Sequence, residues 1–216
     1  RRTQPTQGRE LIMPAPHLEV LVEEPSMEAF LRALLPRLLP QDRSFGVHAF
    51  QGKSDLLGNL EARLRGYAAW LPPHGRIVVV VDRDDDDCRA LKRRLEAICR
   101  RAGLQTRTST GKAQWQIVNR IAIEELEAWY FGDWQAVRTA YPRVPGTIPE
   151  RQGFRDPDAI AGGTWEAFER VLQKHGYFKG GLAKIAAARA IGAQIAPERS
   201  RSRSFAVFCE AIAEAA

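Results

Sequence analysis

The sequence has few cysteine and histidine residues. The three cysteines, Cys88, Cys99 and Cys209, lie far apart, and none has a CxxC or CxxH spacing. An odd number of separated cysteines does not suit a disulfide framework and is typical of reduced thiols in a cytoplasmic protein. The four histidines also lack paired ligand spacing. These absences argue against a zinc site.

Long apolar runs are absent as well. The longest aliphatic run, 77–81, is IVVVV, whereas a membrane-spanning helix needs about 20 apolar residues. Residues 1–12 are polar and lack the apolar segment of a secretory signal. We expect them to be a disordered extension, either artificial or encoded upstream of a start at Met13. The sequence therefore predicts no membrane partner.

Positive charge exceeds negative charge. The chain has 32 Lys and Arg against 26 Asp and Glu, a formal net charge of +6. Such a surface attracts polyanions at low salt, which permits a nucleic acid as partner. The contact face that we expect on one amphipathic helix consists of Lys92, Arg93, Arg100 and Arg101.

Apolar runs alternate with amphipathic segments, which predicts an α/β fold. The predicted strands include 18–23, 45–50 and 77–81, the last of which is β-branched throughout, as in a central parallel strand. Pro36 is expected to kink or end the first helix, and Gly103 to end the third. We expect an α/β domain over 13–140 and a helical C-terminal extension packed on it over 141–216.

Acidic residues follow two predicted strands. Glu23 and Glu24 end the first strand, and Asp82 and Asp84 follow 77–81. Ligands of parallel α/β sheets sit beyond the carboxyl ends of the strands, and carboxylates without His or Cys favour Mg²⁺ or Mn²⁺. The alternative is that the acidic run 82–87 caps the next helix and is otherwise a solvated loop.

A third acidic group, at 124–127, adds to these two sources of carboxylate. The combination resembles the Toprim domain of topoisomerases, primases and overcoming-lysogenisation-defect (OLD) nucleases, in which a Glu after the first strand and a later DxD bind catalytic Mg²⁺. Three stretches resemble more closely a bacterial Toprim-like family known only as domain of unknown function 4276: LVEEPSMEAFLRALLPRLLP, VVVVDRDDDDCRALKRRLE and RIAIEELEAWYFGDW. The resemblance implies a Toprim-like three-layer sandwich with a mainly parallel central sheet and a C-terminal helical extension.

The resemblance also implies metal ligands. Glu23 matches the Toprim glutamate, and Asp82 and Asp84 match the two DxD aspartates. Glu125 and Glu127 match an acidic pair that completes the second metal site in the OLD-type branch. Which of the acidic residues at 124–127 reaches the metal depends on the helix phase.

Lys184, with Lys179 as the alternative, matches the lysine that the OLD-type branch uses near the scissile phosphate. Two positions depart from the pattern. Glu24 replaces the glycine usual after the Toprim glutamate, and Met27 stands where the OLD branch often has a second glutamate. These departures keep open a protein with a degenerate centre, which binds metal or nucleic acid as a regulator without cleaving it.

With this resemblance, the leading hypothesis is a cytoplasmic Mg²⁺- or Mn²⁺-dependent nuclease or nickase that acts on nucleic-acid phosphodiesters, with DNA as the expected partner. OLD-type Toprim domains are joined to ATPase domains, and no ATPase motif occurs here, so the resemblance implies a separate ATPase partner, in phage defence. A less favoured alternative is a phosphatase with Asp82 as nucleophile and Asp84 as acid, but Asp86 stands where that family has Thr or Val.

Two further patterns have a structural and a functional interpretation. In the alternating Arg–Ser stretch 199–204, Ser204 is either the N-cap of the last helix or a phosphate contact. We expect one group of aromatic residues to be core rather than a base-stacking platform, namely Trp115, Trp129, Tyr130, Phe131 and Trp134.

Overall fold

A four-stranded parallel sheet forms the centre of the protein. The computed structural model describes residues 17–72, 74–112 and 114–216, so the extension expected at 1–12 and the start expected at Met13 lie outside the described residues. The strands are β1 (His17–Val22), β2 (Ser44–Ala49), β3 (Arg76–Asp82) and β4 (Ile117–Ala122). Their order is β2-β1-β3-β4, and all neighbours are parallel. The two strands that lead into acidic residues, β1 and β3, are therefore adjacent.

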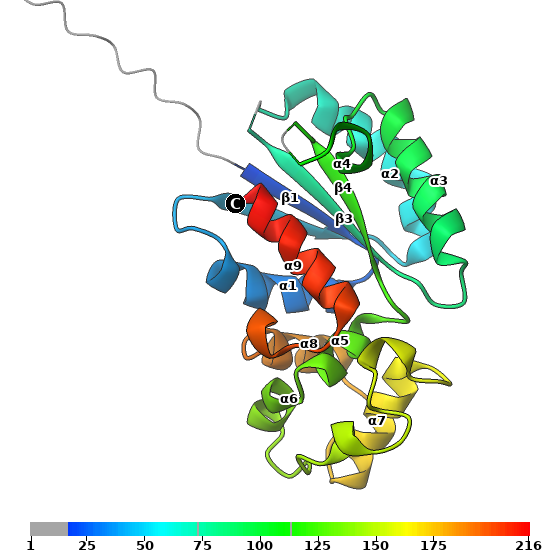
Figure 1. Ribbon diagram of the computed structural model, residues 1–216, viewed down its shortest axis with the longest axis vertical. Coiled ribbons are helices and arrows are strands. Elements are labelled where there is room, and N and C mark those ends of the chain that lie inside the picture. The colour runs from blue at the N-terminus through cyan, green and yellow to red at the C-terminus, as the bar shows by residue number, and fades with distance from the viewer. Residues whose placement is uncertain (1–16, 73, 113) are drawn as a thin grey trace, which may run out of the picture.

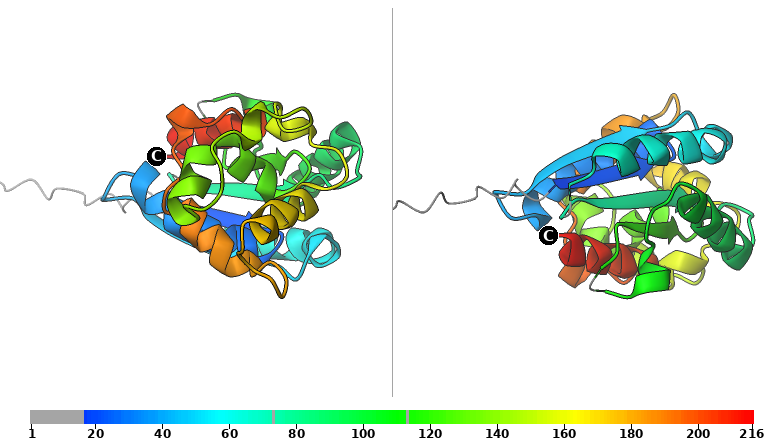
Figure 2. Two further views of the ribbon diagram at one scale, coloured as in Figure 1. Left: turned by 90° about the horizontal axis from the view of Figure 1, so that it is seen from below. Right: turned by 90° about the horizontal axis from the view of Figure 1, so that it is seen from above.

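Helices cover both faces of the sheet (Figure 1). On one face lie α2 (Lys53–Trp70) and α3 (Cys88–Arg101), and on the other lie α1 (Pro25–Leu38) and α9 (Arg203–Ala215). The views along the sheet in Figure 2 show the three layers. The predicted α/β sandwich with a parallel sheet is confirmed, and the last helix of the chain covers the sheet itself.

The β-branched run of β3 explains why both faces are covered. Val79 and Val81 belong to the core beneath α2 and α3, whereas Val78 and Val80 belong to the core beneath α1 and α9. All four are fully buried. A strand with apolar side chains on both sides needs a helical layer on each.

The remaining helices lie beyond the carboxyl ends of the strands, in the lower part of Figure 1. They are α5 (Leu126–Gly132), α6 (Trp134–Ala140), α7 (Thr164–Lys174) and α8 (Lys184–Gly192). The short helix α4 (Arg107–Thr110) is not among them, because it precedes β4. The 3₁₀ turns are η1 (Ile148–Glu150), η2 (Pro157–Ala159) and η3 (Pro197–Arg199). The aromatic residues around α5 are buried, as predicted, and join the core beneath α1 and α9.

The helix ends in the structure agree with the sequence-based expectation at Gly103 and differ from it at Pro36 and Ser204. Gly103 follows α3 with a positive φ of 82°, as expected of a stop. Pro36 lies in the last turn of α1, and the helix continues past it to Leu38. The N–H of Leu39 still donates to the Leu35 carbonyl. The N-cap of α9 is Ser202 and not Ser204.

The cysteines are free thiols. No helix in the described part of the chain is long and apolar enough to cross a membrane.

Candidate functional site

The adjacency of β1 and β3 brings Glu23 to Asp82. Asp82 is the last residue of β3, and Glu23 is the first residue after β1. The N–H of Asp82 donates to Oε2 of Glu23 at 3.2 Å. Two acidic residues far apart in the sequence thus meet at the carboxyl edge of the sheet.

Asp82 is a buried carboxyl group with one oxygen that has no hydrogen-bond partner. Its exposed fraction is 6%, and Oδ1 has no partner. Burial raises the pKa of Asp82 well above its ordinary value, and the negative charges of Glu23, Glu127 and Glu24 raise it further. The protein therefore buries this carboxyl group among other negative charges and leaves its Oδ1 without a donor.

Burial also raises the pKa of two neighbouring carboxyl groups. Burial raises the pKa of Glu127 to about 7, although the positive charge of Lys184 lowers it. Burial likewise raises the pKa of Glu23 to about 7, against the effect of Lys53. We call Glu23, Glu24, Asp82 and Glu127 the acidic cluster.

Asp84 is placed differently. It has a left-handed backbone with φ of 48°, and its N–H donates to the Glu124 carbonyl at 3.0 Å. Its half-exposed carboxylate pairs with Nζ of Lys53 at 2.6 Å, and the same Nζ pairs with Asp86 at 2.8 Å. Asp84, the second DxD aspartate, is thus paired with a lysine. It also lies close enough to Glu23 to raise the pKa of that residue.

Sequence reasoning missed Lys53. A signal existed, because Lys53 is the first residue of α2, and the helix dipole disfavours a cation at a helix N-terminus unless a specific anion is nearby. The anions are Asp84 and Asp86, which follow β3.

The acidic run after β3 has divided roles. Asp87 is the N-cap of α3, and its Oδ1 accepts from the N–H of Ala90 at 2.7 Å. Asp84 and Asp86 bind Lys53, and Asp82 belongs to the acidic cluster. The capping interpretation is therefore right for Asp87.

Glu125 and Glu127 point to different places. Oε2 of Glu125 accepts from the Thr164 hydroxyl at 3.0 Å and from the N–H of Trp165 at 2.9 Å, so it holds the start of α7. Glu127 is only 2% exposed and interacts electrostatically with Asp82. Glu124 pairs with Arg83.

Of the two candidate lysines, Lys184 lies beside the acidic cluster. Its positive charge lowers the pKa of Glu127, and its Nζ lies 4.8 Å from the centre of the Trp165 ring. Lys179 is exposed.

A pocket of about 340 Å³ borders the site. Its walls include Asp84, Asp85, Glu124, Glu125 and Glu166, together with two glycines before α7. The surface next to the acidic cluster is therefore itself acidic.

The chemistry of the donors fits a hard divalent cation. The groups are carboxylates, and the buried Oδ1 of Asp82 lacks a partner. In the part of the chain that the structure describes, no group of three or more His, Cys, Asp or Glu side chains is arranged to hold a metal ion. Two of the expected metal ligands have other partners in the structure, because Asp84 pairs with Lys53 and Glu125 accepts from the start of α7.

The four residues of the basic face expected on α3 differ in their surroundings. Lys92 donates to the Asn119 carbonyl at 2.6 Å and pairs with Glu96, and Arg101 pairs with Glu61. Arg93, Arg100 and Arg101 are exposed, whereas Lys92 is half-buried. Three of the four cations therefore stay at the surface.

A comparison with protein families assigns the chain. The family model described as a domain of unknown function (DUF4276) matches residues 22–213. The chain belongs to this family. The DUF4276 match spans every residue of the acidic cluster and both candidate lysines. No curated protein and no solved structure matches the chain.

Proposed function

We propose that this DUF4276 protein is a Mg²⁺- or Mn²⁺-dependent nuclease or nickase that cleaves nucleic-acid phosphodiesters. The observation that carries the proposal is the environment of Asp82. Its buried Oδ1 has no hydrogen-bond partner, and three other carboxyl groups lie close enough to raise its pKa. A divalent cation would neutralise this excess of negative charge. The resemblance to Toprim domains supports the same chemistry.

In this proposal Glu23, Asp82 and Glu127 would hold the cation through carboxylate oxygens once their side chains turn towards it, and Asp84 would contribute if it left Lys53. When bound, the cation polarises the phosphoryl group and offsets the charge that develops during hydrolysis. Lys184 lies beside Glu127 and would offset charge on the phosphate. Glu127, with its pKa raised to about 7, can hold or release a proton near neutral pH.

The partners and the location in this proposal follow from the resemblance and the composition. OLD-type Toprim domains are joined to an ATPase domain. In this proposal a separate ATPase protein takes the place of that domain, and the two proteins act together in phage defence. Free thiols support a cytoplasmic location.

One observation favours a regulator with a degenerate centre as the second candidate. The ammonium group of Lys53 already binds Asp84 and Asp86, so a cation of the chain itself stands beside the DxD motif. Such a protein would bind metal or nucleic acid without cleaving it. A phosphatase is less well supported, because Asp86 stands where that family has Thr or Val.

The test is cleavage of supercoiled plasmid, linear DNA and labelled RNA by the purified protein. We expect nicked or shortened products with Mg²⁺ or Mn²⁺ and none with a chelator. Asp82→Asn should reduce the rate by about 100-fold or more, whereas Asp42→Asn, the same change at an exposed aspartate before β2, should leave it unchanged.

Cleavage that survives in Asp82→Asn would overturn the nuclease proposal. A metal-dependent rise in melting temperature without cleavage of any substrate would favour the regulator.

A further inference from the structure

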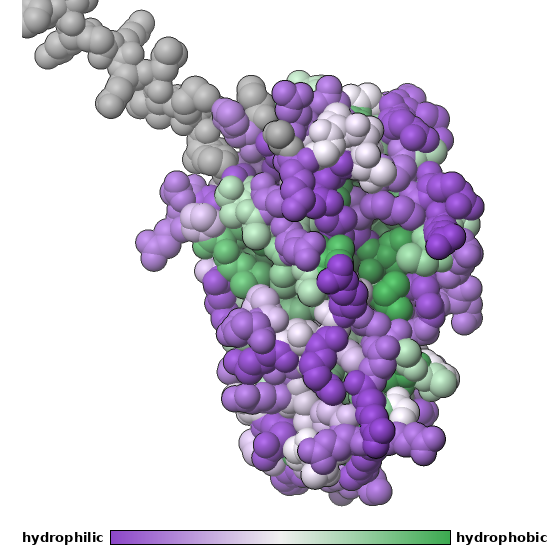
Figure 3. Space-filling model, viewed as in Figure 1, coloured by the Kyte–Doolittle hydropathy of each residue, from purple (hydrophilic) through white to green (hydrophobic). Residues whose placement is uncertain are grey.

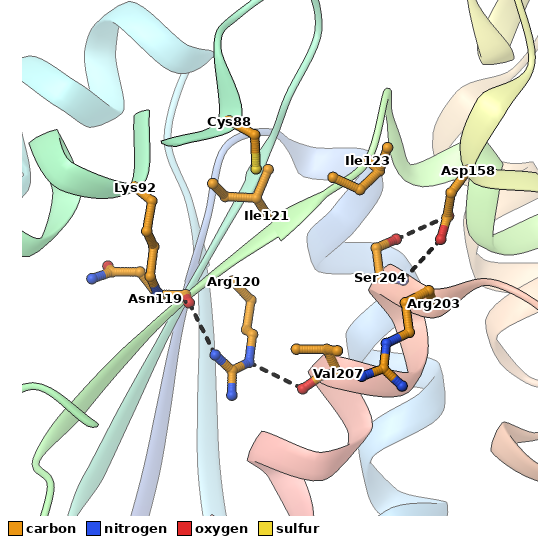
Figure 4. Close-up of a pocket in the computed structure, with 10 residues that line it drawn as sticks. All are labelled: Cys88, Lys92, Asn119, Arg120, Ile121, Ile123, Asp158, Arg203, Ser204 and Val207. Atoms are coloured by element: carbon orange, nitrogen blue, oxygen red, sulfur yellow. Dashed lines mark hydrogen bonds between the residues drawn. The ribbon is translucent and has the colours of Figure 1, made fainter. Parts of the chain in front are cut away.

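A second concave surface lies at the free edge of β4. It is a groove of about 410 Å³ between α3 and α9 (Figure 4). Apolar surface bordered by hydrophilic residues is visible in this region in Figure 3. We call it the β4 groove and define it by its apolar side chains and its cations, which are Ile121, Ile123, Val207, Lys92, Arg120 and Arg203.

Lys92 pairs with Glu96, so the two arginines carry the positive charge that is left in the groove. Arg120 is only 9% exposed, and it donates from Nε to the Val207 carbonyl at 3.0 Å and from Nη1 to the Asn119 carbonyl at 3.3 Å. Its Nη2 has no partner. Within the described ranges no carboxylate forms an ion pair with Arg120 or Arg203. A buried guanidinium without a counterion is costly, so an anion in the groove would be stabilised.

The one acidic side chain that lines the groove is committed elsewhere. Oδ1 of Asp158 accepts from the Ser202 hydroxyl at 2.7 Å, and its Oδ2 accepts from the N–H of Ser204 at 2.9 Å. Asp158 thus occupies the N-terminus of α9, where the sequence allowed a phosphate contact. An incoming phosphate would meet Arg203 at the rim instead, because Arg203 is exposed.

We propose that the β4 groove binds a nucleotide of single-stranded nucleic acid, with its phosphate at Arg203 and its base against Ile121, Ile123 and Val207. The inference rests on the proposed function for the choice of a nucleic acid, because Ile123 directly precedes Glu124 of the acidic pocket. The groove therefore leads towards the candidate centre.

The size and lining of the groove favour a single strand over a duplex. Its volume is that of a small-ligand pocket, which suits one nucleotide. In a duplex the faces of the bases are stacked and cannot contact an apolar wall, whereas an unpaired base can. The alternative of a purely electrostatic surface would not need the apolar side chains.

The experiment measures fluorescence anisotropy of a labelled oligothymidine of about 12 nucleotides, and of a duplex of the same length, in a chelator. Arg203→Ala should weaken single-strand binding about fivefold to tenfold and should reduce the slope of log affinity against log salt by about 0.7. The matched control is Arg94→Ala, which removes the same charge from an exposed site on the other side of α3 from Lys92 and should change neither quantity.

A second measurement keeps the test decisive if a variant misfolds. Cys88 lines the groove and Cys209 does not, and both residues are half-buried. The oligonucleotide should slow alkylation of Cys88 by N-ethylmaleimide, measured by peptide mass spectrometry, and should leave the rate at Cys209 unchanged.

Equal effects of Arg203→Ala and Arg94→Ala, a duplex bound as tightly as the single strand, or an unprotected Cys88 would overturn the proposal. Binding is measured without cleavage, so the two proposals fail separately. Strand binding that depends on Arg203 in a protein without nuclease activity would retain the groove and reject the nuclease.

Discussion

Glu19 and Asp82 lie on neighbouring strands and are equally buried, each 6% exposed, but their surroundings are opposite. Glu19 accepts from Nε2 of His17 and of His48, both at 2.7 Å, and from the Tyr67 hydroxyl at 3.1 Å. Oδ1 of Asp82 accepts from no donor. Burial of a carboxylate is therefore no sign of a functional site by itself, and unmet bonding capacity is the more specific signal.

The backbone and side chains around Glu19 pack closely against its carboxylate. A Cβ on Gly46 would come within 2.8 Å of Nε2 of His48 and 2.9 Å of Oε2 of Glu19, so a larger residue there would displace the ends of these side chains. Both carboxylate oxygens of Glu19 accept from side chains, which come from β1, β2 and α2. This arrangement stabilises the fold, whereas the acidic cluster lowers stability unless a cation or protons are bound.

The largest difference should appear in the pH dependence of stability without divalent metal. The pKa of Glu127 is raised from 4.5 to about 7 in the folded protein, so the folded state binds more protons than the unfolded state between these values. The free energy of unfolding should therefore fall as pH rises from about 5 to 8, with a contribution from Glu127 on the order of 3 kcal/mol. Urea unfolding at several pH values measures it.

Glu127→Gln serves as the control for this profile and should make it shallower, with the remaining slope coming from Glu23 and Asp82, whose pKa values burial also raises. A wild-type stability that stays constant or rises over the same pH range would contradict the assignment.

Glu19→Gln should give the next largest effect, a loss of about 2 kcal/mol in the free energy of unfolding. The amide presents donors to groups that are themselves donors, and charge-assisted hydrogen bonds are lost. The control is Glu28→Gln, which breaks an exposed pair with Arg32 and should cost less than about 0.5 kcal/mol. Equal losses in the two variants, measured in urea, would remove the contrast between Glu19 and an ordinary surface residue.

Asp82→Asn should have the opposite sign. It removes a buried charge and almost no volume, so without metal the variant should be as stable as the wild type or up to about 1 kcal/mol more stable. Mn²⁺ should raise the melting temperature of the wild type more than that of the variant. If Asp82→Asn melts well below the wild type and responds equally to Mn²⁺, Asp82 is a structural residue.

Lys53→Met should change stability least, by less than about 1 kcal/mol, because its partners Asp84 and Asp86 are largely exposed. Removing its positive charge should strengthen Mn²⁺ binding by about threefold or more, measured by calorimetry. Unchanged Mn²⁺ affinity together with lost cleavage would place Lys53 on the phosphate instead.

The sequence predicts half of the site because half of it follows from topology. The β-branched run before Asp82 indicates a central strand, and strand ends of a parallel sheet share an edge, so Glu23 and Asp82 could be placed together. Lys53 could not be placed, because its contact with Asp84 depends on how α2 begins relative to a loop 31 residues later.

The choice between Glu125 and Glu127 was beyond the sequence for a related reason. Helix α5 begins at Leu126, so Glu125 precedes the helix and turns towards Thr164, 39 residues away. No local pattern specifies which segment will lie against a given helix start. Long-range packing, and not propensity, separates the two glutamates.

The two hydrogen bonds to the Asn119 carbonyl have a consequence for how copies of the protein meet. β4 is an edge strand, and the open carbonyls of such a strand recruit strands from other molecules. At Asn119 the acceptor is already taken by Lys92 and by Arg120. A second chain that tried to extend the sheet here would have to displace two cations, which protects the exposed edge against aggregation.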